Sequence, residues 1–337
     1  MKKTVSFGDV LLVPQYSEIF SRKEVDLSCK ISNEVKVKIP IISSPMDTVT
    51  GVDMAVAMSQ AGGLGILHRY NTPAEQQKMA EKALLKGKNV AVAIGVTGDY
   101  LERATLLVKT GVKILCLDIA HGHHALMRHA LSVLRNTFGD DIHLMAGNVA
   151  TLEGFNDLAD WGANSVRVGI GGGSICSTRI QTGHGVPTLQ SVIDCSFSDR
   201  DALLVADGGI KNSGDITKAL AAGADLVMVG SLLAGTDQSP GEIINRNGEK
   251  FKAYRGMASK EAQIEWRGHF ASIEGVSSVI PCKGDVKRVV KELETGIRSG
   301  LSYTGAKNIS ELQSKCEFIE QTPAGQLESS THINNKK

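Results

Sequence analysis

The chain has 337 residues, of which 42 % are hydrophobic and 22 % are charged, and its formal net charge at pH 7 is +1. This balance is typical of a globular protein with a full core, and the small net charge does not favour nucleic acid or an anionic membrane as a partner. No apolar run is long enough to span a membrane, and the N-terminal residues lack the apolar stretch of a signal peptide.

Eight short runs of apolar, often β-branched residues predict eight strands. Each run is almost continuously apolar, as expected of parallel strands that are covered on both faces. The runs are Ile39–Met46, Gly63–Leu67, Val90–Val96, Ile114–Ala120, His143–Val149, Ser165–Ile170, Leu203–Gly209 and Leu226–Ser231. The segments between them carry helical periodicity, for example Pro73–Lys86, Tyr100–Lys109 and His124–Asn136.

Eight alternating strand and helix units predict an α/β fold, a (β/α)8 TIM barrel. We expect a single catalytic domain over residues 1–325 and a disordered polar tail over residues 326–337. A doubly wound sheet is the alternative, but the count of eight strands and the lack of an early G-x-G-x-x-G motif disfavour it.

The longest interval between strands follows the sixth one and contains the glycine-rich segment Gly169–Arg179. Loops at the carboxyl ends of barrel strands carry the chemistry of this fold, so Cys176 is a candidate nucleophile and Thr178 lies two residues away. A tight turn with a buried, inert cysteine is the alternative. A second long segment, from Leu232 to about Val286, follows the eighth strand and predicts a flap over the site.

Glycines also end the seventh and eighth strands, in Asp207-Gly208-Gly209 and Gly230-Ser231. The loops after these strands form the common phosphate site of TIM barrels, and Asp207 beside them suits the hydroxyls of a ribose. The pattern therefore favours a nucleoside monophosphate as ligand, although simple glycine-rich strand ends remain an alternative.

Two further strand ends carry polar residues. Asp118 ends the fourth strand and is followed by His121, His123 and His124, which lack an acidic partner at ligand spacing, so a metal site is disfavoured. Asn148 ends the fifth strand, where its amide serves either a base or nicotinamide, or neighbouring backbone groups.

The ordered motifs now suggest a family. They are Ser43–Val49, Asp118–Gly122, Ala146–Val149, the cysteine loop, Asp207–Gly209 and Tyr254–Met257. Together they resemble the IMP dehydrogenase/GMP reductase family from Val5 to Ile319. The resemblance implies that Cys176 attacks C2 of a purine nucleotide, that Thr178 and Glu274 transfer protons, and that a monovalent cation, K+, is bound by carbonyls of Gly171, Gly173 and Cys176.

The resemblance also implies the residues that bind the two nucleotides. For the substrate, GMP or IMP, these are Ser44, Met46, Asn148, Ser174, Asp207, Gly208, Gly209, Gly230, Ser231, Tyr254, Gly256 and Met257. For the nicotinamide cofactor they are Ser21, Arg22, Asp118, Ile119, Ala120, Ile170 and Gly171. A homotetramer follows from the resemblance as well.

The two activities of the family differ at the flap. A dehydrogenase hydrolyses its covalent adduct and brings an Arg-Tyr pair on the flap to activate water, whereas a reductase expels ammonia. Residues 258–273 contain no tyrosine, and Arg267 is followed by Gly268. The regulatory CBS modules typical of the dehydrogenase are absent, because Asn71-Thr72-Pro73 leads directly through the second helix to Val90. These features favour a GMP reductase that uses NADPH.

Some residues depart from the reductase pattern. Ser43-Ser44-Pro45-Met46 is dehydrogenase-like, Gly172 replaces the usual Pro or Ser, and Ser177 replaces a common Thr. An IMP dehydrogenase without CBS modules therefore stays the alternative, and a nucleotide-binding barrel without turnover or a flavin barrel are further candidates. Six scattered cysteines with no paired spacing favour reduced thiols and a cytoplasmic location.

Overall fold

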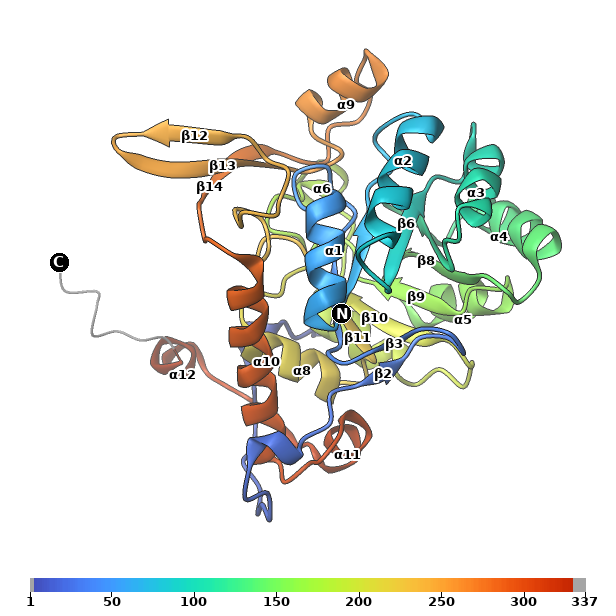
Figure 1. Ribbon diagram of the computed structural model, residues 1–337. Coiled ribbons are helices and arrows are strands. Elements are labelled where there is room, and N and C mark those ends of the chain that lie inside the picture. Colours follow the sequence, from blue (N-terminus) through green and yellow to red (C-terminus); the bar gives the residue numbers. More distant parts are fainter. Residues whose placement is uncertain (1–2, 330–337) are drawn as a thin grey trace.

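The computed structural model describes residues 3–329. Eight parallel strands close into a barrel in the order β10-β11-β4-β5-β6-β7-β8-β9, and helices surround it (Figure 1). This confirms the predicted (β/α)8 architecture. The barrel strands are β4 (Ile41–Ser43), β5 (Leu64–Leu67), β6 (Val90–Ile94), β7 (Ile114–Asp118), β8 (His143–Val149), β9 (Ser165–Val168), β10 (Leu203–Asp207) and β11 (Leu226–Val229).

The helices that follow these strands pack outside the barrel. They are α1 (Val52–Ala61), α2 (Pro73–Leu84), α3 (Tyr100–Lys109), α4 (Ala125–Phe138), α5 (Leu152–Asp160), α7 (Thr188–Cys195), α8 (Ser213–Ala221) and α10 (Val286–Tyr303). Helix α2 begins where the sequence predicts, because Thr72 and Glu75 form a capping box and proline occupies the first helical position.

Several predicted strands end too late. The run predicted as Leu203–Gly209 stops at Asp207, because Gly208 and Gly209 have φ angles of +94° and +78° that a strand does not allow. The run predicted to reach Ile170 stops at Val168 for the same reason, since Gly169 has φ +144°. These truncations leave Gly208, Gly209 and the start of the segment between β9 and α7 (residues 169–187, called the catalytic loop from here on) in irregular backbone at the carboxyl ends of the strands.

The core has two parts that the barrel wall separates. The larger lies between strands and helices, and the smaller fills the barrel interior with residues such as Ile42, Ile66 and Met145. Strands β2 (Cys29–Lys30) and β3 (Lys36–Val37) cover the end of the barrel at which the strands begin. Ile31 and Val37 pack there in the same cluster as the residues of the barrel interior. One end of the barrel is therefore sealed, and the carboxyl ends of the strands remain for function.

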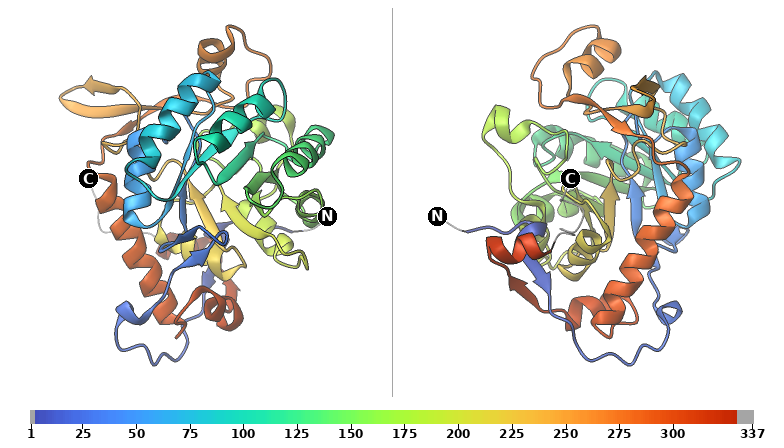
Figure 2. Two further views of the ribbon diagram at one scale, coloured as in Figure 1. Left: turned by 45° about the vertical axis from the view of Figure 1, so that its right-hand side comes forward. Right: turned by 90° about the vertical axis from the view of Figure 1, so that its left-hand side faces the viewer.

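The segment after β11, called the flap, lies outside the barrel at its open end (Figure 2). It consists of β12 (Ile243–Arg246), β13 (Glu249–Arg255), α9 (Lys260–Arg267) and β14 (Ser277–Pro281), and its three strands pair in the order β12-β13-β14. The short helix α6 (Thr178–Thr182) of the catalytic loop lies at the same end.

The N- and C-terminal segments meet at the other side of the molecule. They contain the 3-10 helices η1 (Phe7–Asp9) and η2 (Arg22–Glu24), strand β1 (Val10–Leu12), which pairs with β15 (Phe318–Glu320), and helices α11 (Ile309–Lys315) and α12 (Pro323–Glu328). The sequence predicts a disordered tail from residue 326 onward, and this is wrong for residues 326–328, because they belong to helix α12. Residues 330–337 lie outside the described residues.

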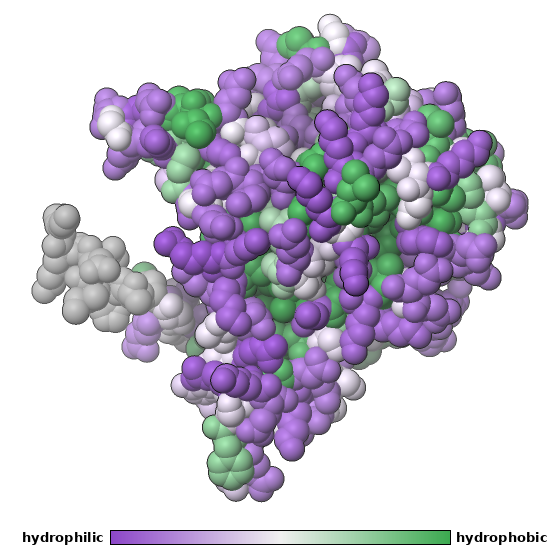
Figure 3. All heavy atoms as spheres, in the orientation of Figure 1, coloured by the Kyte–Doolittle hydropathy of each residue, from purple (hydrophilic) through white to green (hydrophobic). Residues whose placement is uncertain are grey.

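Hydrophilic side chains cover most of the face seen in Figure 3, with smaller apolar areas between the helices. Among residues 3–329, no helix has both the length and the apolar character that a membrane crossing requires.

Candidate active site

A cavity of about 530 Å3 opens at the carboxyl ends of the barrel strands. The catalytic loop, the ends of β4, β7, β8 and β10, and the flap all contribute to its wall. Seventeen of the residues predicted from the sequence line this cavity: Ser44, Met46, Asp118, Ile119, Ala120, Asn148, Ile170, Gly171, Gly173, Cys176, Thr178, Asp207, Gly208, Tyr254, Gly256, Met257 and Glu274. The structure thus brings together residues that are spread over more than two hundred positions.

Glycines allow the catalytic loop to turn back over the barrel. A Cβ atom on Gly169 would lie 1.9 Å from the carbonyl oxygen of Asp207, which no side chain permits. Gly172 also packs closely, since a Cβ there would lie 2.3 Å from Thr188 Oγ1. The loop therefore passes directly against the end of β10 and carries Cys176 into the cavity.

Three side chains form a hydrogen-bonded chain in the cavity. The Cys176 thiol donates to Thr178 Oγ1 at 3.2 Å, and the Thr178 hydroxyl donates to Glu274 Oε2 at 2.9 Å. The second oxygen of Glu274 accepts a hydrogen bond from the Ser272 hydroxyl at 3.1 Å. This arrangement links a thiol, a hydroxyl and a carboxylate in series, which is suited to nucleophilic and general acid–base chemistry.

The backbone fixes this chain because the catalytic loop pairs with the flap. Cys176 and Gly275 form an antiparallel bridge. The Ser177 N–H donates to the Glu274 carbonyl at 2.9 Å, and the Val276 N–H donates to the Ile175 carbonyl at 3.0 Å. The Cys176 thiol and the Glu274 carboxylate are therefore held in register by main-chain hydrogen bonds as well as by side chains.

Other thiols of the protein are unsuited to nucleophilic chemistry. Burial raises the pKa of Cys29 and of Cys195 to about 12 and that of Cys116 to about 11. Burial also raises the pKa of Cys316. These four thiols stay protonated near neutral pH, and none of them lines the cavity.

An arginine inside the barrel wall ties two carboxylates together. Arg167, on β9, is 6 % exposed and donates to Asp118 Oδ1 at 2.6 Å and to Asp207 Oδ2 at 3.0 Å. Asn148 Nδ2 donates to the same Asp207 oxygen at 2.8 Å and to the Gly169 carbonyl at 2.8 Å. The amide of Asn148 therefore serves its neighbours, while its Oδ1 is buried without a partner among the described residues.

A third group of residues converges at the end of β11. A Cβ atom on Gly230 would lie 2.9 Å from Ser44 Oγ and 3.3 Å from Tyr254 Oη. Tyr254 forms a side-chain hydrogen bond with Ser174, and burial raises the pKa of its phenol. Ser44 Oγ is buried without a hydrogen-bond partner among the described residues. An unsatisfied hydroxyl beside a glycine is suited to a polar ligand group at this position.

Comparison with known proteins decides the family. The family model for the IMP dehydrogenase / GMP reductase domain matches residues 4–332. The chain belongs to this family. It is 35 % identical to an inosine-5'-monophosphate dehydrogenase of Nitrosopumilus maritimus over 98 % of each chain. It is 31 % identical to a GMP reductase of Leishmania major, with 97 % of this chain and 96 % of the relative covered.

A solved structure is also closely similar. A variant of GMP reductase from Trypanosoma brucei in complex with guanosine 5'-monophosphate superposes with a TM-score of 0.93. The two sequences are 30 % identical, and the match covers 98 % of each chain. Members of this family are oxidoreductases of purine nucleotides that use nicotinamide cofactors.

Six of the residues implied by the family resemblance lie outside the cavity wall. Ser174 and Gly230 adjoin it through Tyr254, and Gly209 and Ser231 follow strand ends at the same rim. Ser21 and Arg22 are different, because they lie at η2, which packs against α10 and far from the flap in Figure 1. A single chain therefore does not bring these two residues to the site.

Sequence reasoning assigned no binding or catalytic role to six polar residues of this cavity: Arg69, Tyr70, Arg167, Gln263, Arg267 and Ser272. Arg69 follows β5, and its position at a strand end was a usable signal. Arg167 was also detectable as the charged residue in the apolar strand Ser165–Val168. Gln263 and Arg267 lie on the flap helix α9; the sequence predicts the flap, but no local pattern indicates which of its side chains face the cavity.

The histidines after β7 have structural partners. His123 Nε2 lies 2.8 Å from Asp157 Oδ2, so an acidic partner exists on α5 although none lies nearby in sequence. His124 Nδ1 accepts a hydrogen bond from the Leu126 N–H and caps helix α4. Among the described residues, no group of three or more metal-ligating side chains is present.

Proposed function

We propose that this family member is a GMP reductase, which converts GMP to IMP and ammonia with NADPH as reductant. The observation that supports this assignment best is the pair of hydrogen bonds that link the side chains of Cys176, Thr178 and Glu274 in series. It places a proton path between the nucleophile and a carboxylate, which a departing amine needs.

In the proposed reaction the Cys176 sulfur forms a bond to C2 of GMP, and the bond from C2 to the exocyclic amine breaks. The thiol proton passes through Thr178 to Glu274 and then to the departing amine, which leaves as ammonia. NADPH supplies the hydride that C2 receives. Cleavage of the carbon–sulfur bond then releases IMP and leaves Cys176 as a thiolate, which takes a proton from water to restore the thiol.

Other residues in the cavity wall and beside it have proposed binding roles. Arg167 and Asn148 both contact Asp207 Oδ2, so Asp207 Oδ1 is left by these two residues and is suited to the ribose hydroxyls. Ser44, Ser174, Gly209, Gly230, Ser231 and Tyr254 surround the proposed phosphate position, and Met46, Gly208, Gly256 and Met257 the base. Asp118, Ile119, Ala120, Ile170 and Gly171 form the proposed nicotinamide side of the cavity.

A monovalent cation, K+, is part of the proposal. Its ligands would be the carbonyls of Gly171, Gly173 and Cys176, and neutral oxygens suit a singly charged ion. The Gly173 carbonyl accepts a hydrogen bond from the Cys176 N–H at 3.2 Å, which leaves its second lone pair for the ion. The cation would stiffen the loop that carries the nucleophile.

The proposed assembly is a homotetramer in the cytoplasm. Six cysteines without a disulfide support a reducing compartment. Ser21 and Arg22 support an assembly, because they would reach a cofactor only from a neighbouring subunit.

IMP dehydrogenase is the second candidate, because relatives with that name reach 38 % identity, as in Cryptosporidium parvum. A direct assay separates the two. With GMP, NADPH and K+, we expect NADPH absorbance to fall and ammonia to appear in equal amounts. Formation of NADH from IMP and NAD, without any consumption of NADPH by GMP, would reverse the assignment. Binding of GMP with no redox change in either assay would indicate a nucleotide-binding barrel without turnover.

Replacing Glu274 by glutamine is expected to lower kcat for GMP by about 10²- to 10⁴-fold, because the amide keeps a contact with Thr178 but does not take up its proton. Steady-state kinetics and a titration of GMP binding measure the effect, and binding should change little. The control is Glu261→Gln, a carboxylate of the same flap that accepts a hydrogen bond from Ser277 and lines none of the described cavities. Equal kcat values for the two variants would contradict a proton-transfer role.

A further inference from the structure

Three cavities meet at the C-terminal end of the flap helix α9. Besides the catalytic cavity, a larger one of about 900 Å3 lies between the flap and the start of α2, and a smaller one of about 150 Å3 lies over the end of β6. Arg267 lines all three cavities. Any long ligand that leaves the catalytic cavity on this side therefore passes this side chain.

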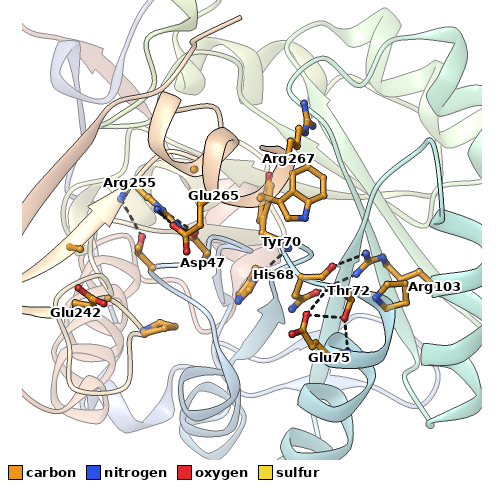
Figure 4. Close-up of a pocket in the computed structure, with 18 of the residues that line it drawn as sticks. Asp47, His68, Tyr70, Thr72, Glu75, Arg103, Glu242, Arg255, Glu265 and Arg267 are labelled. Atoms are coloured by element: carbon orange, nitrogen blue, oxygen red, sulfur yellow. Dashed lines mark hydrogen bonds and ion pairs between the residues drawn. The ribbon is translucent and has the colours of Figure 1, made fainter. Parts of the chain in front are cut away.

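The two outer cavities differ in charge. The larger one is lined by the carboxylates of Asp47, Glu75, Asp99, Glu242 and Glu265 against three arginines. Figure 4 shows Arg255 turned toward Asp47 and Glu265, and it pairs with both. The excess of carboxylates over arginines in the larger cavity disfavours the binding of a phosphate there. The smaller cavity is lined by three arginines, at positions 69, 103 and 267, against the single carboxylate of Asp99.

Only one of these three guanidinium groups is available. Arg103 pairs with Asp99 at 2.8 Å, and Arg69 donates to the Asp118 carbonyl at 3.1 Å with Nε 3.7 Å from the Asp118 carboxylate. Arg267 forms no ion pair with any residue in 3–329. In Figure 4 the side chain of Arg267 points away from Asp47, Arg255 and Glu265.

An indole holds Arg267 beside the catalytic cavity. The Arg267 Cζ atom lies 4.7 Å from the Trp266 ring centroid, and the Arg69 Cζ atom lies 5.5 Å from the same ring. Trp266 in turn packs edge-on against Tyr70 at 5.1 Å. Two cations gathered on one ring repel each other, and an anion between or beside them relieves that repulsion.

We propose that Arg267 binds a phosphate group of the nicotinamide dinucleotide, whose adenosine half leaves the catalytic cavity over the end of β6. This inference rests on the proposed function for the presence of a dinucleotide, which both reactions of the family use. Two phosphate sources share this chemistry: the pyrophosphate, which every nicotinamide dinucleotide carries, and the 2'-phosphate, which only NADPH carries. A guanidinium suits either one through paired N–H groups.

The test compares the full-length protein with Arg267→Gln and Arg267→Lys. We expect Arg267→Gln to raise the KM and Kd for NADPH by about ten- to a hundred-fold, with kcat nearly unchanged, because a charge-assisted contact is lost. The lysine variant should recover part of the affinity. Arg246→Gln is the matched control, since Arg246 is an exposed arginine of β12 that lines none of the three cavities.

Titration with NADH identifies the phosphate. An equal loss of NADH and NADPH affinity assigns Arg267 to the pyrophosphate, and a loss confined to NADPH assigns it to the 2'-phosphate. Unchanged affinity for both dinucleotides overturns the inference. So does a fall of kcat with IMP and NAD at unchanged dinucleotide affinity, which would make Arg267 a water-activating group. Because binding is measured directly, a wrong choice between the two reactions would not hide the result.

Discussion

Replacing Cys176 by alanine is expected to lower turnover by more than about 10⁴-fold while GMP still binds. The thiol is the only group of the hydrogen-bonded chain that forms a bond to the substrate in the proposed reaction, so Thr178 and Glu274 have nothing to assist once it is gone. Alanine fits the half-buried position without a clash, so the fold should persist. Steady-state assays of NADPH consumption and a calorimetric titration with GMP measure the two effects.

The matched control is Cys29→Ala. This thiol lies on β2 at the sealed end of the barrel, and burial raises its pKa to about 12. Its removal should leave turnover within about two-fold of the unmodified protein, since Cys29 lies at the opposite end of the barrel from the cavity. Turnover that survives in Cys176→Ala would eliminate the covalent route for both candidate reactions, and loss of turnover in both variants would show that the alanine effect is not specific to the nucleophile.

Replacing Arg167 by methionine is expected to destabilise the protein by about 3 kcal/mol, because Asp118 and Asp207 would lose the cation that compensates both. We take the low end of the usual range, since both carboxylates face the cavity and are 16 % and 17 % exposed. Methionine fills most of the volume, so the loss reports on charge rather than on a void. Urea unfolding monitored by circular dichroism measures the change in the free energy of unfolding.

Arg200→Met is the control for the loss of an arginine with two acidic partners. Arg200 pairs with Asp160 and Asp199 at the surface, where water screens the charges, so stability should change little. Arg167→Lys should recover only part of the loss, because an ammonium does not present the planar fork that reaches both carboxylates. If Arg167→Met and Arg200→Met unfold at the same urea concentration, the buried arginine does not stabilise the carboxylates as argued.

The sequence predicts the barrel well because its information is local. Each buried parallel strand carries its own apolar run, and helices carry their own periodicity, as Tyr100–Lys109 illustrates, or their own caps, as Thr72 does for α2. The ends of strands are less predictable, because Gly208 and Gly209 are flanked by residues that also suit a strand, and only their positive φ angles stop it.

The site was predictable only where residues follow strand ends or known motifs. Arg167 escaped attention because its role depends on Asp118 and Asp207, which are 49 and 40 positions away. The sequence places Arg267 on the flap but does not place it in the cavity wall, because the flap reaches the barrel through contacts such as Trp266 with Tyr70, which join segments that are distant in sequence. Such contacts are consequences of the closed barrel and have no local signature.

The bridge between Cys176 and Gly275 has a consequence for the timing of the reaction cycle. In the proposed reaction, proton transfer needs Glu274 in line with Thr178, and the backbone hydrogen bonds that secure this alignment also join the two walls of the cavity. A substrate or product that passes between these walls must part them, and the proton path is then interrupted. For a ligand that takes this route, chemistry and exchange are therefore mutually exclusive states of one protein.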